Sequence, residues 1–114
     1  MAAPDRIRRR PEFERIYNTG AKVHGRFMTL FVMVNGTDAP RLGVAATRKI
    51  GSAVVRNRAK RRARELFRRR NKIGGLDIVI VPRREMVDAP FAQLEAEYVA
   101  LLSRRARPRV AASV

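Results

Sequence analysis

The fold is decided by residues 41–67, with the sequence RLGVAATRKIGSAVVRNRAKRRARELF. Every second residue at the start of this segment is apolar, which predicts a strand over 41–47. A glycine–serine pair then ends the strand, and the Ser52 hydroxyl can cap a following helix. A helix is expected over residues 53–70, because apolar residues recur there at helical spacing in one stripe. The stripe consists of Val55, Ala59, Ala63, Leu66 and Phe67.

The outer faces of this helix carry the densest positive charge in the chain. Residues 56–72 contain ten Lys or Arg and a single acid, Glu65. Surface helices usually mix the two signs, because opposite charges four residues apart support each other. Here three pairs at that spacing are alike in charge, namely Arg58 with Arg62, Lys60 with Arg64 and Arg64 with Arg68. The helix therefore favours a polyanionic partner, and a solvated surface helix is the alternative.

Arg56 differs from the other cations, because its angle on the helix falls inside the apolar stripe. Its aliphatic stem is expected to pack at the edge of the core, with the guanidinium in solvent or on a ligand. Asn57 lies outside the stripe, and its amide can read a base edge, a 2′-hydroxyl or a phosphate. The alternative for Asn57 is a hydrogen bond to its own helix backbone.

Length and charge limit the class of protein. A chain of 114 residues fits one domain, residues 1–114. Residues 1–10 are expected to form a flexible basic arm and residues 105–114 a flexible basic tail. The net charge of +16 favours nucleic acid as the partner, with an anionic membrane surface as the second possibility. A membrane role is disfavoured, because the apolar stripe of the basic helix is better used in a core.

The chain lacks the side chains that several kinds of catalytic and metal site require. The chain contains no cysteine, which excludes disulfides and thiolate metal sites. His24 is the only histidine, so a serine or cysteine triad of the usual type cannot be assembled. The ten acids are scattered, which gives no support to a paired-carboxylate metal site. We predict no catalytic side chain and no metal ligand in the protein.

No apolar run is long enough to span a bilayer or to act as a secretory signal, so a cytoplasmic location is expected.

The rest of the chain predicts two more helices and three more strands. A helix is expected over 11–18, with Gly20 as its left-handed cap. The other elements are a short strand near 21–25, strands over 27–34 and 76–81, and a last helix from Pro90. The short turn at 35–40 favours antiparallel pairing of the two strands that it joins. This order, α-β-β-β-α-β-α, predicts an α+β two-layer sandwich.

Three aromatic residues are candidates for stacking on unpaired bases, namely Phe13, Tyr17 and Phe31. Phe31 lies on a strand with two apolar faces, so its face is either covered by a helix or open for binding. Core packing is the alternative interpretation for each ring. Arg48 and Lys49 lie between a strand and a helix, where they can steer phosphates toward the helix N-terminus.

The joint pattern resembles the bacterial ribonuclease P protein subunit family. That family carries an R-N-R motif followed by K-R and a further Arg, matched here by Arg56, Asn57, Arg58, Lys60, Arg61 and Arg64. An upstream K-K-x-G-N-A-V is similar to residues 48–54, and the family's first helix is similar to residues 11–20. The resemblance spans roughly residues 6–104.

The resemblance implies an RNA-binding subunit of ribonuclease P, an endoribonuclease whose chemistry belongs to a catalytic RNA and its Mg²⁺ ions. The implied partners are that RNA and the single-stranded 5′ leader of precursor tRNA, which the enzyme removes. The free protein is expected to be a monomer without an organic cofactor. The implied fold is a mixed sheet with helices on one side and a left-handed β-α-β crossover, like domain 2 of ribosomal protein S5.

The resemblance and the charge pattern together divide the candidate residues into two groups. A leader cleft between the sheet and the first helix would be lined by Phe13, Tyr17, Phe31, Arg48, Lys49, Arg56 and Asn57. The catalytic RNA would be contacted by Arg58, Lys60, Arg61, Arg64 and Arg68. The alternative function is a general single-strand RNA-binding or ribosome-associated protein without a processing role.

The sequence departs from the family pattern in the basic helix. Ala59 and Ala63 stand where larger aliphatic residues are usual, and Arg62 stands where an apolar residue is frequent. We expect that the helix either packs closer to the sheet or is held more weakly.

Overall fold

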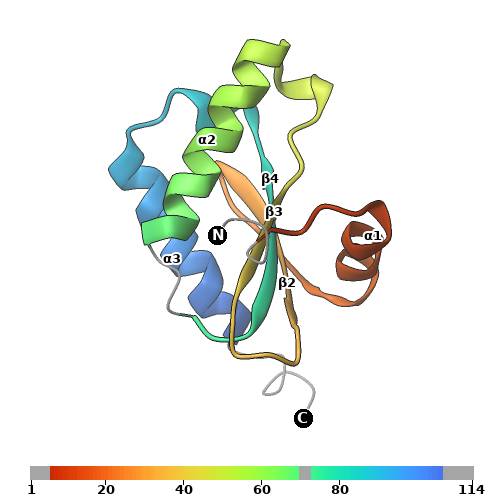
Figure 1. Cartoon of the computed structure of the whole chain (residues 1–114). Coiled ribbons are helices and arrows are strands. Elements are labelled where there is room, and N and C mark those ends of the chain that lie inside the picture. Colours follow the sequence, from red (N-terminus) through yellow and green to blue (C-terminus); the bar gives the residue numbers. More distant parts are fainter. Residues whose placement is uncertain (1–5, 70–72, 107–114) are drawn as a thin grey trace.

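The computed structural model describes residues 6–69 and 73–106 (Figure 1). The α+β class and the element order are as predicted, with two short 3-10 turns in addition. The elements are α1 (Arg10–Thr19), β1 (Ala21–His24), β2 (Met28–Val34), β3 (Arg41–Val44), η2 (Arg48–Ile50), α2 (Ala53–Arg69), β4 (Leu76–Pro82), η3 (Arg84–Val87) and α3 (Phe91–Ala106).

The sheet is mixed, with the strand order β1-β2-β4-β3. β2 pairs antiparallel with both β1 and β4, whereas β3 pairs parallel with β4. The predicted antiparallel pairing of β2 with β3 is therefore wrong, because β4 lies between them. Most of β4 is buried on both faces, and such a strand gains most from a central place. Residues 35–40 can extend about 20 Å, enough to cross one intervening strand.

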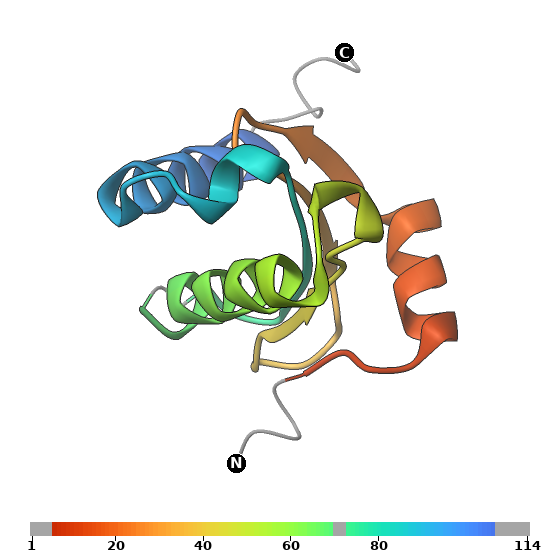
Figure 2. The same ribbon diagram turned by 90° about the horizontal axis from the view of Figure 1, so that it is seen from above.

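The helices cover both faces of this sheet (Figure 2). α2 and α3 lie on one face, where they bury the main core, and α1 lies on the opposite face. The expectation of helices on one side therefore holds for α2 and α3 but not for α1. The largest completely buried residues of the main core are Tyr98, Met28, Leu30, Leu66, Ile78, Ile80, Met86, Leu94 and Leu101.

The basic helix α2 buries its small core residues completely and is tied to the next helix connection by Arg62. Ala59 and Ala63 have no exposed surface. Arg62 turns inward, donating one hydrogen bond to the Val87 carbonyl at 3.1 Å and another to the Ala89 carbonyl. Arg62 thus ties α2 to the η3–α3 connection, a contact that the sequence did not reveal. The apolar stripe is used in the core, as the sequence predicts, and no described helix is long and apolar enough to cross a membrane.

Gly20 ends α1 for a reason different from the predicted one. Its φ of −80° is that of extended backbone, so it is not a left-handed cap. A Cβ at this position would lie 2.7 Å from the Ile16 carbonyl oxygen and 2.9 Å from that of Val32. Glycine is required because α1 turns tightly into β1 against β2.

The described part of the basic arm is docked on the sheet. Ile7 is buried, and its N–H donates to the Leu42 carbonyl at 2.9 Å, as part of a parallel bridge beside β3. Residues 6–10 thus run from the edge strand β3 to the start of α1, and the flexibility of the arm stays a prediction. At the other end, α3 continues to Ala106, and the rest of the predicted tail lies outside the described residues.

A buried acid links the starts of β3 and β4. Asp77 is 2% exposed, and its two oxygens accept hydrogen bonds from Arg41 Nε at 2.9 Å and Nη2 at 2.8 Å. The Asn35 amide donates to it as well, at 3.0 Å. Burial raises the pKa of Asp77, but the hydrogen bonds from Arg41 and Asn35 and the charge of Arg41 outweigh it, so the net shift is downward.

The lowered pKa predicts a loss of stability in acid. The Asp77 carboxylate stabilises the fold fully above its unfolded pKa, and this contribution disappears as the pH falls through the lower folded pKa. The free energy of unfolding should therefore decrease below about pH 4. The Asp77→Asn variant should be about 2 kcal/mol less stable than the wild type at pH 7. Urea denaturation at several pH values should show this difference narrowing toward pH 2, and a constant difference would contradict the assignment.

Candidate RNA-binding surfaces

Three predicted rings form one aromatic cluster, defined as Phe13, Tyr17 and Phe31. The Tyr17 ring meets Phe31 edge-on at a centroid distance of 4.8 Å and lies 6.2 Å from Phe13. Phe13 and Phe31 are half-buried, whereas Tyr17 is 38% exposed. Burial raises the pKa of the Tyr17 hydroxyl above its ordinary value. The cluster thus combines core packing with an accessible ring.

The elements position this cluster from opposite sides. α1 supplies Phe13 and Tyr17, and β2 supplies Phe31 on the face that α1 covers. Phe13 can pack directly on β3 because residue 43 is glycine, where a Cβ would lie 2.8 Å from the ring. Lys22 adds a cation, with its Nζ 5.5 Å from the centre of the Phe31 ring. No sequence pattern marks Lys22, but the pairing of β1 with β2 places it opposite Phe31.

The η2 turn presents a second group of cations at the end of β3. Arg48 and Lys49 are exposed there. Arg56 is half-buried, and its Nη1 donates to the Gly51 carbonyl at 3.1 Å. This agrees with the predicted place of Arg56 at the edge of the core. Arg84 donates to the neighbouring Ile50 carbonyl at 2.6 Å, a contact that no sequence pattern predicts.

The η2 cations and the aromatic cluster are joined through β3 rather than by direct contact. After β3, Ala45 packs against the apolar residues under α1, and Ala46 packs against Ile50. Asn57 is exposed on the first turns of α2, beside this junction. Within residues 6–69 and 73–106, the one ring–cation contact of the cluster is that of Lys22.

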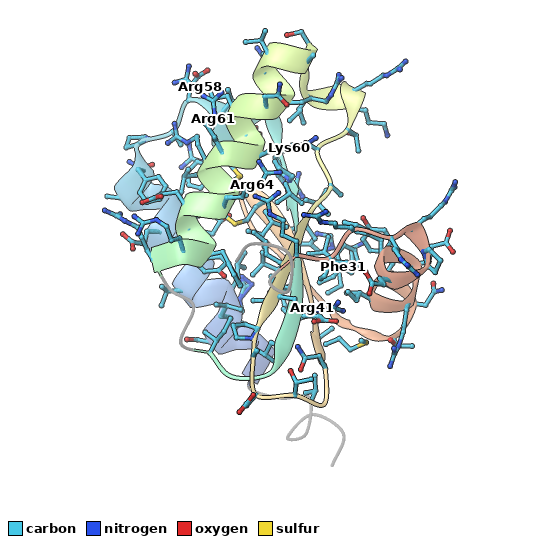
Figure 3. The ribbon with its side chains drawn as sticks, viewed as in Figure 1. Phe31, Arg41, Arg58, Lys60, Arg61 and Arg64 are labelled. Carbon is cyan, nitrogen blue, oxygen red and sulfur yellow. The ribbon has the colours of Figure 1, made fainter. Side chains whose placement is uncertain are left out.

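Lys60 and Arg64 lie on the side of α2 that faces the centre of the molecule (Figure 3). With Arg6 and Arg8 of the docked arm they surround a pocket of about 140 Å³, floored by Ile7, Phe13, Leu42, Gly43 and Val44. Burial and the nearby charge of Arg6 lower the pKa of Arg64. No described acid forms an ion pair with any of these four cations. The contribution of Arg6 and Arg8 was missed, because their segment has no pattern of its own.

The other predicted cations of α2 differ in their exposure and in their pairing with acids. Arg58 and Arg61 project from the far side of the helix (Figure 3) and are exposed. Arg58 has only a loose ion pair with Asp88, at 3.8 Å. Arg68 is engaged by Glu65 at 2.6 and 3.0 Å, and this acid raises the pKa of Arg68. Arg68 is therefore the least available of the cations predicted for this surface.

Acidic and histidine side chains do not gather in the part of the chain that the structure describes. No group of three or more that could hold a metal ion occurs there. His24 lies at the end of β1, with its Nδ1 3.4 Å from the Thr29 hydroxyl. The arrangement of side chains thus offers surfaces for binding an anionic polymer, with stacking on one side and phosphate contacts on the other.

Comparison of the sequence with known proteins finds one family throughout. The Ribonuclease P family model matches residues 1–106. The ribonuclease P protein component of Oleidesulfovibrio alaskensis is 41% identical over 90 residues, covering 75% of this chain and 72% of that protein. The same component of Caldanaerobacter subterraneus is 37% identical over 101 residues, covering 87% of each.

Solved structures agree with the sequence comparison. The RNase P protein from Thermotoga maritima superposes with a TM-score of 0.78 at 33% identity, covering 87% of this chain and 96% of that one. The RNase P protein of Staphylococcus aureus superposes with a TM-score of 0.78 at 31% identity, covering 90% of this chain and 95% of that one. Because the family model matches residues 1–106 of the 114, this chain belongs to the ribonuclease P protein family.

Proposed function

We propose that this protein is the RNA-binding subunit of ribonuclease P and assists a catalytic RNA in removing the 5′ leader of precursor tRNA. Family membership implies tRNA processing together with RNA. The observation that carries the finer proposal is the presence of two unlike surfaces on one rigid frame. An aromatic cluster with an exposed tyrosine suits unpaired bases, and a set of unpaired cations suits the phosphates of a folded RNA.

The leader binds between α1 and the sheet in this proposal. Tyr17 is accessible for stacking, and Lys22 beside Phe31 supplies a charge for a backbone phosphate. Arg56 and Asn57 lie where the leader passes from the sheet to α2, with Arg48 and Lys49 as further phosphate contacts. Stacking on these rings tolerates any leader sequence, because every base has a π-face.

The catalytic RNA binds α2 and the arm in this proposal. Lys60 and Arg64, together with Arg6 and Arg8, offer four cations around one pocket. Arg58 and Arg61 extend the surface over the far side of the helix. Because phosphate contacts release counterions, this binding is expected to weaken steeply as the salt concentration rises.

The cleavage chemistry belongs to the RNA in this proposal. We assign the oxygens of the RNA as the ligands of Mg²⁺, a cation that prefers oxygen donors and retained waters. The protein acts by binding and orienting the substrate. We further propose that the free protein is a monomer and that it acts in the cytoplasm.

The proposal predicts that the protein stimulates cleavage of precursor tRNA by a matching catalytic RNA. The stimulation should be largest at low Mg²⁺ concentration. The Lys and Arg side chains of the protein then neutralise RNA phosphates that Mg²⁺ would otherwise screen. Single-turnover cleavage of 5′-labelled precursor, with and without the protein, measures this. The control is the same RNA with a basic protein of equal net charge. Tight binding of the catalytic RNA without stimulation would favour the alternative, a general RNA-binding protein.

A further inference from the structure

α1 crosses one face of the sheet and is fixed at its two ends in different ways. At its C-terminal end, the chain passes through Gly20 directly into β1, one edge of the sheet. At its N-terminal end, α1 meets β3, the other edge, where Phe13 packs on Gly43 and Glu12 pairs with Arg41. Noncovalent contacts alone fix this second end, so they set the tilt of α1 over the sheet.

Arg41 is held in one orientation before it reaches α1. Two of its nitrogens are taken by Asp77, a buried residue of β4. The planar guanidinium leaves Nη1 pointing toward α1, where it donates to Glu12 Oε2 at 3.2 Å. Figure 3 shows Arg41 on the side of the sheet that faces α1. A lysine cannot reproduce this arrangement, because it carries a single nitrogen rather than a rigid fork.

Glu12 connects the same brace to the basic arm. Its second oxygen, Oε1, accepts hydrogen bonds from the backbone N–H groups of Arg8 at 3.3 Å and Arg9 at 3.4 Å. This carboxylate therefore caps the first turn of α1 and receives the guanidinium of Arg41 at the same time. The hydrogen bonds from Arg41 and the backbone outweigh the effect of burial, which raises the pKa of Glu12, so its pKa is lowered overall and it stays ionised at neutral pH.

We propose that Arg41 is a positioning residue that holds α1, through Glu12, at the spacing over the sheet that leader binding requires. This inference rests on the proposed leader function. The rings of Tyr17 and Phe31 lie on opposite sides of this spacing, 4.8 Å apart. A small change in the tilt of α1 alters how these two rings present themselves to a base that stacks beside them.

Glu12→Gln and Glu14→Gln form a matched pair that isolates the brace. Both variants remove one negative charge from α1, so any general gain in RNA affinity is the same for both. Within residues 6–69 and 73–106, the one ion pair of Glu14 is with Arg10, on the exposed side of the helix. In the Glu12→Gln variant, the amide oxygen can still cap the arm, while the amide nitrogen faces Arg41 and cannot accept its hydrogen bond.

Holoenzyme reconstituted with the catalytic RNA provides the functional measurement. The affinity for precursor tRNA divided by that for mature tRNA should fall about fivefold in Glu12→Gln, and Arg41→Lys should behave alike. Glu14→Gln should match the wild type. Equal ratios in all three variants and the wild type would overturn the positioning role. A wild-type holoenzyme that does not prefer precursor would instead contradict the leader function itself.

Spin labels test the brace independently of any activity. Because the chain contains no cysteine, Arg10→Cys and Val99→Cys introduce unique labelling sites on α1 and α3, and both positions are exposed. The distance distribution between the labels should shift or broaden when Glu12→Gln is added. It should stay unchanged when Glu14→Gln is added. An identical distribution in both backgrounds would overturn the proposal that Glu12 and Arg41 hold α1 in place.

Discussion

Tyr17→Ala should weaken binding of precursor tRNA to the holoenzyme about tenfold and leave mature tRNA binding nearly unchanged. Tyr17 is the most accessible ring of the aromatic cluster, and loss of one base–aromatic stack costs about 1–3 kcal/mol. Only the precursor carries a leader, so only its affinity depends on this surface. Equilibrium binding of the two tRNAs at fixed salt and metal concentrations measures the ratio directly.

Val99→Ala is a matched control for this experiment. Val99 is 39% exposed, nearly the same as Tyr17, but lies on α3, across the sheet from α1. It should leave both affinities unchanged. Equal losses for precursor and mature tRNA in Tyr17→Ala would place this ring away from the leader. A precursor series with leaders of increasing length should show the loss appear once the leader is long enough to reach Tyr17.

The double variant Lys60→Gln/Arg64→Gln should bind the catalytic RNA about a hundredfold more weakly at moderate salt. Each of these cations borders the pocket shared with the arm, and neither has an ion pair with a described acid. Removal of two phosphate contacts should also flatten the dependence of log K on log salt by about 1.5 units. Binding titrations at four or more salt concentrations measure both quantities.

Arg68→Gln/Arg69→Gln removes the same charge from the same helix and serves as the control. Both arginines are engaged by Glu65, so part of their charge is already compensated. The salt slope should change by less than half as much as in the first variant. Equal slopes for the two double variants would mean that net charge, rather than the position of Lys60 and Arg64, governs the affinity.

The sequence predicts the residues of the aromatic cluster more completely than those of the basic surface. The rings of Phe13, Tyr17 and Phe31 were predicted as a set, and the structure brings them together. For the basic surface, the sequence named Lys60 and Arg64 but not Arg6 or Arg8. The helical residues have a period that reveals their face, whereas the arm takes its shape only from the edge of β3 and has no such signal.

The amino-acid sequence by itself determined the elements, the charge of α2 and the family. These follow from local order, because helical and strand periods, turn residues and the motif around Arg56 all lie within short segments. Only the tertiary structure decided the strand order, the covering of the second face by α1 and the network of Glu12, Arg41 and Asp77. These three residues lie far apart in the chain and meet because β4, the most buried strand, inserts between β2 and β3. The periodicity of a segment does not reveal its neighbours in the sheet. The strand order is set by which arrangement buries the apolar faces of all four strands.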